Sequence, residues 1–314
     1  MKNVLILGSN SFIGSHLARF ISTNPDIHLT AFARTLTESP IDKVSYITGD
    51  YTDKIALSKA LNNQDIVFHF ISQSYPFSSW NDPATEIEKN ILPFINFIEL
   101  CNIANIKKIV FASSGGTVYG VKEFKSDELS GTKPYTPHGM TKLYMENLLI
   151  YAKTKYNIAY DIFRMSNVYG EDQITQKGLG FIHTALENAI LGKPIVIYGD
   201  GSNVRDYIYI DDVCNFLSLS LRKPMEDSDI YNVCCNISVS LNDILKIIKN
   251  DLGINFILEF QPARKSDVPS ICLDNTRILN QFPGYRFVTI KEGIEKIYIS
   301  MSGKLKMKVT DKLQ

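Results

Sequence analysis

The chain has no excess of charge of either sign. Its 314 residues include 33 lysines and arginines and 33 aspartates and glutamates, which leaves a formal net charge of zero at pH 7. A neutral chain creates no overall field that would attract nucleic acid or an anionic membrane surface. We therefore expect no nucleic-acid partner and no membrane partner, and any anionic ligand must be bound by local groups.

Long hydrophobic runs and paired cysteines are also missing. The N-terminal segment MKNVLILGSNS has a short apolar run, too short to span a membrane, and it lacks a small-residue cleavage site. The chain has an odd number of cysteines, and their spacing is not that of metal ligands: Cys101, Cys214, Cys234, Cys235 and Cys272. We expect no metal site, reduced thiols and a cytoplasmic location.

Short apolar runs alternate with helical stretches over the first half of the chain. The runs cover residues 4–8, 28–33, 65–71, 108–114 and 160–166. Strands separated by helices predict an α/β fold with a Rossmann-type, doubly wound parallel sheet. The alternation weakens after about residue 170, so we expect a dinucleotide-binding domain at 1–170 and a smaller substrate lobe at 171–314, some of whose segments return to the first domain. A cleft between them is the expected ligand site.

A glycine-containing loop, GSNSFIG (8–14), follows the first strand and opens a helix. Gly8 allows a tight turn, Gly14 allows close packing of the helix on the sheet, and the small Ser11 lies between them. This context predicts a dinucleotide-binding loop formed by Gly8, Ser11, Phe12, Ile13 and Gly14. The alternative is a ligand-free glycine turn in which Ser11 only caps the helix.

Further segments carry a recognisable pattern: SSGGTVYG (113–120), PHGMTKLYMEN (137–147), RMSNVYGEDQ (164–173) and IYGDGSNVRDYIYIDDV (197–213). With them the chain resembles the extended short-chain dehydrogenase/reductases, which act on nucleotide sugars as NAD(P)-dependent epimerases, dehydratases and reductases. The resemblance covers nearly all of residues 3–300. It implies a nucleotide-diphosphate sugar as substrate and a homodimer.

The end of the second strand bears on the choice of cofactor. An NAD enzyme offers an acid there to the ribose 2′-hydroxyl, whereas this chain has Ala33 and Arg34. An arginine without a neighbouring acid suits a 2′-phosphate, because its planar fork binds phosphate oxygens in pairs. The sequence therefore favours NADP over NAD, unless Arg34 is only an exposed loop charge.

Other cofactor contacts follow from the resemblance alone. It implies that Asp50 meets the adenine amine and that the backbone amide of Tyr51 meets a ring nitrogen; a helix cap by Asp50 is the alternative. The remaining contacts are expected at Phe70, Ile71, Ser72, Asn90 and Lys142.

The catalytic pair departs from the family pattern. The resemblance places a Tyr-x-x-x-Lys pair on one helical face, where the lysine lowers the pKa of the phenol. Here the pair is His138 and Lys142. With an ordinary pKa of ~6.5, an imidazolium at this position could deliver a proton to an alkoxide near neutral pH. The lysine charge would instead favour neutral imidazole, and His138 as a mere helix-start residue is a further alternative.

The hydroxyl that this family presents to the sugar carbonyl is also missing, because its position is Gly115. Ser114 and Thr117 flank the gap, and either hydroxyl could polarise a carbonyl oxygen. Of the two, Thr117 is preferred. The other candidates for proton donor are water, Tyr119 and Tyr135.

The substrate contacts also follow from the resemblance. It implies that Asn167 contacts the substrate and that Arg205 and Arg264 face the nucleotide diphosphate, with Asp267 orienting a ribose or the second arginine. A planar guanidinium matches the oxygens of a diphosphate.

The predicted function is NADP-dependent reduction of a nucleotide-linked 4-keto-6-deoxyhexose, as in deoxysugar synthesis for surface polysaccharides. A net reductase must exchange its cofactor, whereas epimerases of the family keep a bound NAD, and Arg34 favours the former. Two alternatives stay open. One is a 4-epimerase or 4,6-dehydratase with bound NAD, and the other is a non-catalytic protein that binds NADP or a nucleotide sugar.

Overall fold

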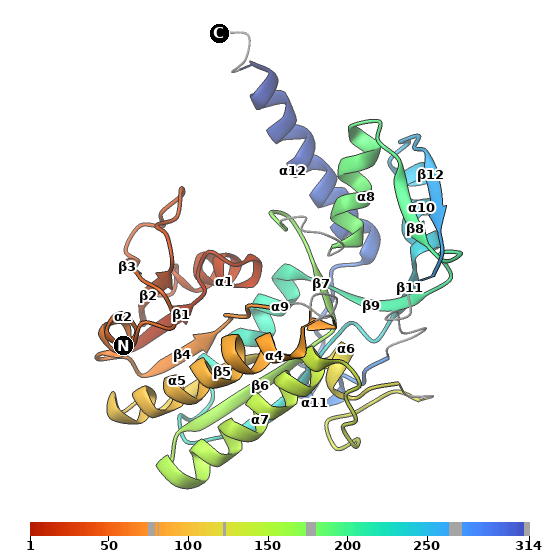
Figure 1. The fold of residues 1–314 in the computed structure, drawn as a ribbon. Coiled ribbons are helices and arrows are strands. Elements are labelled where there is room, and N and C mark those ends of the chain that lie inside the picture. The colour runs from red at the N-terminus through yellow and green to blue at the C-terminus, as the bar shows by residue number, and fades with distance from the viewer. Residues whose placement is uncertain (75–78, 81, 122–123, 174–179, 264–271, 311–314) are drawn as a thin grey trace.

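A parallel sheet of seven strands forms the centre of the molecule, in the order β10-β6-β5-β4-β1-β2-β3 (Figure 1). The computed structural model describes residues 1–74, 79–80, 82–121, 124–173, 180–263 and 272–310, with side chains up to residue 303. The strands are β1 (Lys2–Leu7), β2 (Ile27–Ala33), β3 (Ser45–Thr48), β4 (Ile66–His69), β5 (Lys108–Ser114), β6 (Ala159–Met165) and β10 (Asp229–Val233). The strand order reverses between β1 and β4, so the predicted Rossmann-type fold is confirmed.

Both faces of this sheet are buried. Val4 and Ile6 of β1 belong to one hydrophobic core, and Leu5 and Leu7 belong to another. Successive side chains of a strand point to opposite faces, and helices cover both faces of a parallel sheet. For this reason the strand reads as a continuous apolar run rather than as an alternating one.

The covering helices divide between the two cores. One core includes side chains of α1 (Phe12–Ile21) and α9 (Ile210–Leu217), which contact each other. The other includes side chains of α2 (Lys54–Leu61), α5 (Leu92–Ile103) and α7 (Pro137–Tyr156). Figure 1 shows α5 and α7 side by side across one face of the sheet. The helical turns α4 (Pro83–Glu86) and η1 (Ile87–Ile91) precede α5, and α6 (Gly115–Val118) follows β5.

Shorter elements make up the rest of the chain. A three-stranded sheet has the order β11-β9-β7, and β8 pairs with β12. These strands are β7 (Asn167–Tyr169), β8 (Ile195–Tyr198), β9 (Val204–Tyr209), β11 (Ser238–Ser240) and β12 (Leu258–Gln261). The accompanying helices are α8 (Phe181–Ile190), η2 (Ser218–Leu221), α10 (Leu241–Lys246), η3 (Ile247–Asp251), α11 (Thr276–Leu279) and α12 (Ile290–Thr310).

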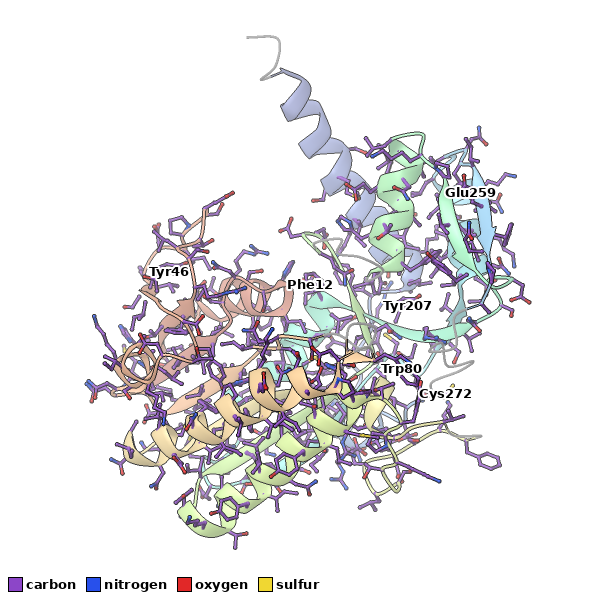
Figure 2. The ribbon with its side chains drawn as sticks, viewed as in Figure 1. Phe12, Tyr46, Trp80, Tyr207, Glu259 and Cys272 are labelled. Atoms are coloured by element: carbon purple, nitrogen blue, oxygen red, sulfur yellow. The ribbon has the colours of Figure 1, made fainter. Side chains whose placement is uncertain are left out.

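The two parts are interwoven rather than consecutive. The late strand β10 pairs in parallel with β6 and so completes the large sheet, while β7 leaves β6 to join the small one. Figure 2 places Phe12 of α1 and Tyr207 of β9 near the junction of the two parts, and both side chains line one cavity. No helix among the described residues is long and apolar enough to cross a bilayer.

Candidate functional site

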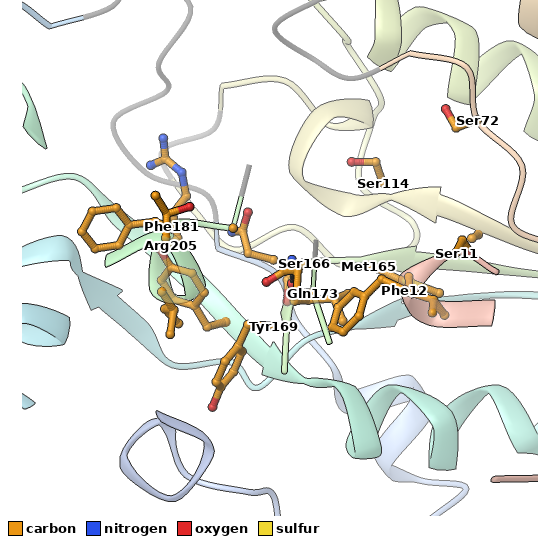
Figure 3. Close-up of a pocket in the computed structure, with 18 of the residues that line it drawn as sticks. Ser11, Phe12, Ser72, Ser114, Met165, Ser166, Tyr169, Gln173, Phe181 and Arg205 are labelled. Atoms are coloured by element: carbon orange, nitrogen blue, oxygen red, sulfur yellow. Dashed lines mark hydrogen bonds between the residues drawn. The ribbon is translucent and has the colours of Figure 1, made fainter. Parts of the chain in front are cut away.

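A cavity of about 850 Å³ lies where the large sheet meets the smaller part. This volume falls in the range of small-molecule and cofactor sites. Figure 3 shows Ser11 and Phe12 at one end of the cavity and Phe181 and Arg205 at the other. The sequence-predicted residues that line it are Ser11, Phe12, Ile13, Phe70, Ser72, Ser114, His138, Lys142, Asn167 and Arg205.

The loop between β1 and α1 turns tightly at its two glycines. Gly8 has a φ of +83°, which favours glycine, and a Cβ on Gly14 would lie 2.3 Å from the carbonyl oxygen of Gly8. Ser11 caps α1 by accepting a hydrogen bond of 3.1 Å from the amide of Gly14. The first turn of α1 has no acidic residue, so its free amides present a positive end to the cavity. These residues fit the pyrophosphate of a dinucleotide.

Arg34 follows the end of β2 and is exposed. Its charge lies close enough to Asp50 to contribute to the lowering of that carboxyl's pKa, after the two hydrogen bonds from Thr52 and against the opposing effect of burial. Asp50 is thus an acid close to Arg34 in space, although no acid adjoins Arg34 in the sequence. The carboxylate of Asp50 is itself engaged by the amide of Thr52 at 2.8 Å and by its hydroxyl at 2.6 Å. The helix cap is provided by Asp53, not by Asp50.

Three of the predicted cofactor residues lie behind the cavity wall. The hydroxyl of Tyr51 is buried at 2.9 Å from Nε2 of His69. Ile71 backs the glycine loop, since a Cβ on Gly8 would lie 3.2 Å from its Cγ1. The side chain of Asn90 is buried and points to Ser74 and Glu86, with 3.1 Å from its Nδ2 to each acceptor.

His138 and Lys142 both face the cavity from the first turns of α7. They lie four residues apart, so the helix brings them to one face. Thr136 caps the helix by accepting from the amide of Gly139, so His138 is not needed as a cap. Nζ of Lys142 donates to the carbonyl oxygen of Ala112 at 2.9 Å.

Burial changes the protonation of this pair. It lowers the pKa of Lys142 to about 8, although the nearby carboxylates of Glu86 and Glu146 act in the opposite direction. Burial and then the charge of Lys142 lower the pKa of His138 to about 3. At neutral pH the lysine carries the proton and the imidazole is neutral. The lowered pKa of His138 favours the alternative of a neutral ring over an imidazolium donor.

The hydroxyls that flank Gly115 are placed differently. Ser114 lines the cavity, whereas Thr117 does not. The hydroxyl oxygen of Thr117 is buried and has no hydrogen-bond partner among the described residues. Tyr119 is also buried away from the cavity. Its hydroxyl donates to Oδ1 of Asn232 at 2.7 Å and accepts from Arg164 at 2.9 Å. A displaced proton donor at Tyr119 therefore does not fit this geometry.

The sequence did not reveal a buried acidic group beneath the pair. Glu146 lies four residues after Lys142 and forms a bidentate ion pair with Arg164. Nη2 of Arg164 is 2.7 Å from Oε2 of Glu146. It also accepts from the hydroxyl of Ser113, which lines the cavity. The spacing of four residues along a predicted helix was the available signal. Ser74, next to His138, was missed as well, since nothing local marks it.

At the other end of the cavity, Asn167 and Arg205 lie on adjacent strands, β7 and β9. Nδ2 of Asn167 donates to the carbonyl oxygen of Asp206 at 3.1 Å, and Nη1 of Arg205 donates to that of Val204 at 2.8 Å. Phe181 and Tyr207 add aromatic surface to the same lining. A cation beside aromatic rings suits a phosphorylated ligand with a planar base. The predicted Arg264 and Asp267 lie outside the described residues.

Comparison with known proteins agrees with this arrangement. The model of the NAD dependent epimerase/dehydratase family matches residues 4–234. UDP-glucose 4-epimerase of Lactobacillus helveticus is 30% identical over 296 residues, covering 87% of this chain and 89% of that protein. dTDP-4-dehydro-6-deoxyglucose reductase of Escherichia coli is 28% identical over 313 residues, covering 96% and 98%.

A solved structure extends the similarity to three dimensions. The UDP-glucose 4-epimerase of Thermotoga maritima, with UDP-glucose, superposes with a TM-score of 0.87 at 27% identity and covers 96% of this chain and 99% of that one. The chain thus belongs to the NAD dependent epimerase/dehydratase family, the extended short-chain dehydrogenase/reductases that its motifs resemble.

Proposed function

We propose that the protein reduces the 4-keto group of a nucleotide-linked 4-keto-6-deoxyhexose with NADPH. The observation that carries this proposal is the protonation of the pair on α7. Both side chains line the cavity from one face of α7, and burial lowers the pKa of Lys142 to about 8 and that of His138 to about 3, which favours an ammonium beside a neutral imidazole at neutral pH. Reduction of a ketone needs a donor first, whereas oxidation of a hydroxyl needs a base first.

The loop after β1 would hold the pyrophosphate, and Arg34 would bind a 2′-phosphate at the end of β2. When bound, NADPH supplies the hydride that adds to the carbonyl carbon. These features support NADP over NAD.

Residues 171–314 would provide most of the sugar-nucleotide lobe, with residues 1–170 holding the cofactor. Arg205 would bind the diphosphate, and Arg264 and Asp267 remain proposed partners from the sequence. The Thermotoga maritima relative was solved with UDP-glucose, which supports this substrate class. The reductase from Escherichia coli supports a 4-keto-6-deoxyhexose.

The proton step follows from the position of Lys142. As the carbonyl carbon gains the hydride, its oxygen becomes an alkoxide and takes a proton from the ammonium. The lysine is left as a neutral amine, which solvent protonates again. A donor with a pKa of about 8 matches the operating pH range of such a step. Ser114 would add a neutral hydrogen bond to the same oxygen.

The second candidate is a nucleotide-sugar 4-epimerase with resident NAD. It is supported by the epimerases of Lactobacillus helveticus and Thermotoga maritima among the relatives. An epimerase must first remove a proton from the substrate hydroxyl, and neither side chain of the pair is an effective base in its resting state.

One set of assays separates the candidates. The protein is incubated with dTDP-4-keto-6-deoxyglucose and NADPH, and the loss of reduced-cofactor absorbance is followed, with Lys142→Met as the inactive control. Parallel samples receive UDP-glucose, and any bound cofactor is released by denaturation. Oxidation of NADPH is expected. Its absence, together with UDP-galactose formation on bound NAD, would establish the epimerase. Ligand binding without either reaction would indicate a binding protein.

The proposal extends to a homodimer. Exposed apolar side chains gather on the outer surface of η1, α5 and α7, at Ile87, Leu92, Ile103, Met140, Tyr144, Ile150 and Tyr151. These helices contact one another, so their exposed side chains can form a continuous surface. Apolar surface of this kind favours association of two copies about a two-fold axis.

A further inference from the structure

A chain of buried polar side chains leads from Glu86 through Asn90 to Ser74 and His138, the last two of which line the cavity. Oε2 of Glu86 accepts from Nδ2 of Asn90 at 3.1 Å, and the same Nδ2 lies 3.1 Å from Oγ of Ser74. Oγ of Ser74 is 3.4 Å from Nδ1 of His138. All four side chains are less than 10% exposed, so water competes little with these contacts.

The orientation of the Asn90 amide follows from its partners. Its Oδ1 lies 2.9 Å from the backbone amide of Gln73, which can only donate. Oδ1 must therefore be the acceptor, and the amino group must face Ser74 and Glu86. The hydroxyl oxygen of Ser74 consequently accepts from Asn90.

The direction of the next hydrogen bond follows in turn. Once its oxygen accepts from Asn90, the hydroxyl hydrogen of Ser74 needs an acceptor, and Nδ1 of His138 provides one. If Nδ1 carried a hydrogen instead, the hydroxyl hydrogen of Ser74 would have no acceptor among the described residues. An unsatisfied buried donor costs about 1–3 kcal/mol. The alternative tautomer is disfavoured by an amount of this order.

We propose that Asn90 and Ser74 are positioning residues that hold His138 as the neutral Nε2–H tautomer, so that it polarises the substrate carbonyl as a hydrogen-bond donor. The ring takes the place of the family's tyrosine without taking over its proton transfer. Glu86 contributes twice, because it orients Asn90 and its charge favours the ammonium form of Lys142. The donor ring and the proton-carrying lysine then face the same cavity.

The tautomer is a property of the protein without substrate, whereas its catalytic consequence rests on the proposed ketoreductase function. The two are therefore tested separately. The protein is labelled with ¹⁵N-histidine, and the ring nitrogens of His138 are assigned by comparison with His138→Gln. We expect Nε2 to carry the hydrogen and Nδ1 to be bare at neutral pH. A hydrogen on Nδ1, or on both nitrogens, would overturn the proposal whether or not the protein is a reductase.

Variants of Ser74 provide the matched comparison. Ser74→Ala removes the hydroxyl and should give a mixture of tautomers, while Ser74→Thr retains the hydroxyl and should keep the wild-type spectrum. In the reductase assay, Ser74→Ala should lower kcat on the order of tenfold with little change in the KM for the nucleotide sugar, by analogy with the loss of a hydrogen-bond partner of a metal-binding histidine. Ser74→Thr should restore kcat. A Ser74→Ala spectrum identical to wild type would contradict the positioning role.

Discussion

Leu273 fills the space next to Gly115 where a side chain would otherwise lie. A Cβ built on Gly115 would be 2.4 Å from Cδ1 of Leu273 and 3.1 Å from the carbonyl oxygen of Arg164. Leu273 is itself buried. The loss of the family's hydroxyl at this position is therefore matched by packing from a distant part of the chain.

Restoring that hydroxyl should destabilise the protein. We expect Gly115→Ser to lower the free energy of unfolding by about 1–3 kcal/mol, because the new Cβ overlaps Leu273. In a Leu273→Ala background the same change should cost less, and urea titration of all four proteins measures the coupling. Equal costs in the two backgrounds would show that the two residues do not interact.

The glycine loop offers a test of cofactor binding. Gly14→Ala places a methyl group 2.3 Å from the carbonyl oxygen of Gly8, which the loop must move to accommodate. We expect NADPH affinity to fall by roughly tenfold or more, equivalent to about 1.4 kcal/mol, measured by titration calorimetry. Gly131→Ala is the control, since apart from its two chain neighbours no described residue has an atom within 4 Å of its Cβ position. Equal affinity of both variants would argue against this loop as the site.

Arg34 should determine the preference between the two nicotinamide cofactors. Removing its charge by Arg34→Ala should raise the dissociation constant for NADPH by roughly tenfold to a hundredfold, the value of hydrogen bonds to a charged group. The constant for NADH should change little, because NADH has no 2′-phosphate. Equilibrium fluorescence titrations give both constants. A parallel loss for both cofactors would contradict a specific 2′-phosphate contact.

The pH profile of the reduction should report Lys142. Its pKa in the folded protein is lowered to about 8, so kcat/KM should fall as the pH rises through that value and the ammonium donor is lost. Lys142→Arg keeps its charge, so in this variant the decline should move to higher pH, whatever its absolute rate. An unchanged decline would assign the proton to another group.

The apolar surface of η1, α5 and α7 predicts the oligomeric state. Tyr144 is 47% exposed in this surface, and Tyr144→Glu should convert dimers to monomers by introducing a charge into the interface. Sedimentation equilibrium measures the mass. Ile55→Glu on α2 is the control, because this residue is 83% exposed on another helix. A monomeric wild-type protein would exclude the dimer.

The local sequence pattern was enough to predict the parallel sheet, the glycine-containing turn after β1 and the family. Apolar runs, glycine positions and the spacing of His138 and Lys142 act over a few residues, so they are legible in the sequence. The family pattern also led to Asn167 and Arg205 in the cavity lining. It could not reveal that Asn90 points to Ser74, because that depends on how η1 packs against the segment that follows β4.

The chemistry of the site was decided by tertiary structure. His138 in isolation would have a pKa near ~6.5, whereas burial and then the charge of Lys142 lower it to about 3, so that the ring stays neutral well into the acidic range. Thr117 lies out of the cavity although it is close in sequence to Ser114, which lines it. Protonation and access depend on solvent exclusion by segments distant in sequence, and that exclusion exists only once the sheet, α7 and the smaller part have packed together.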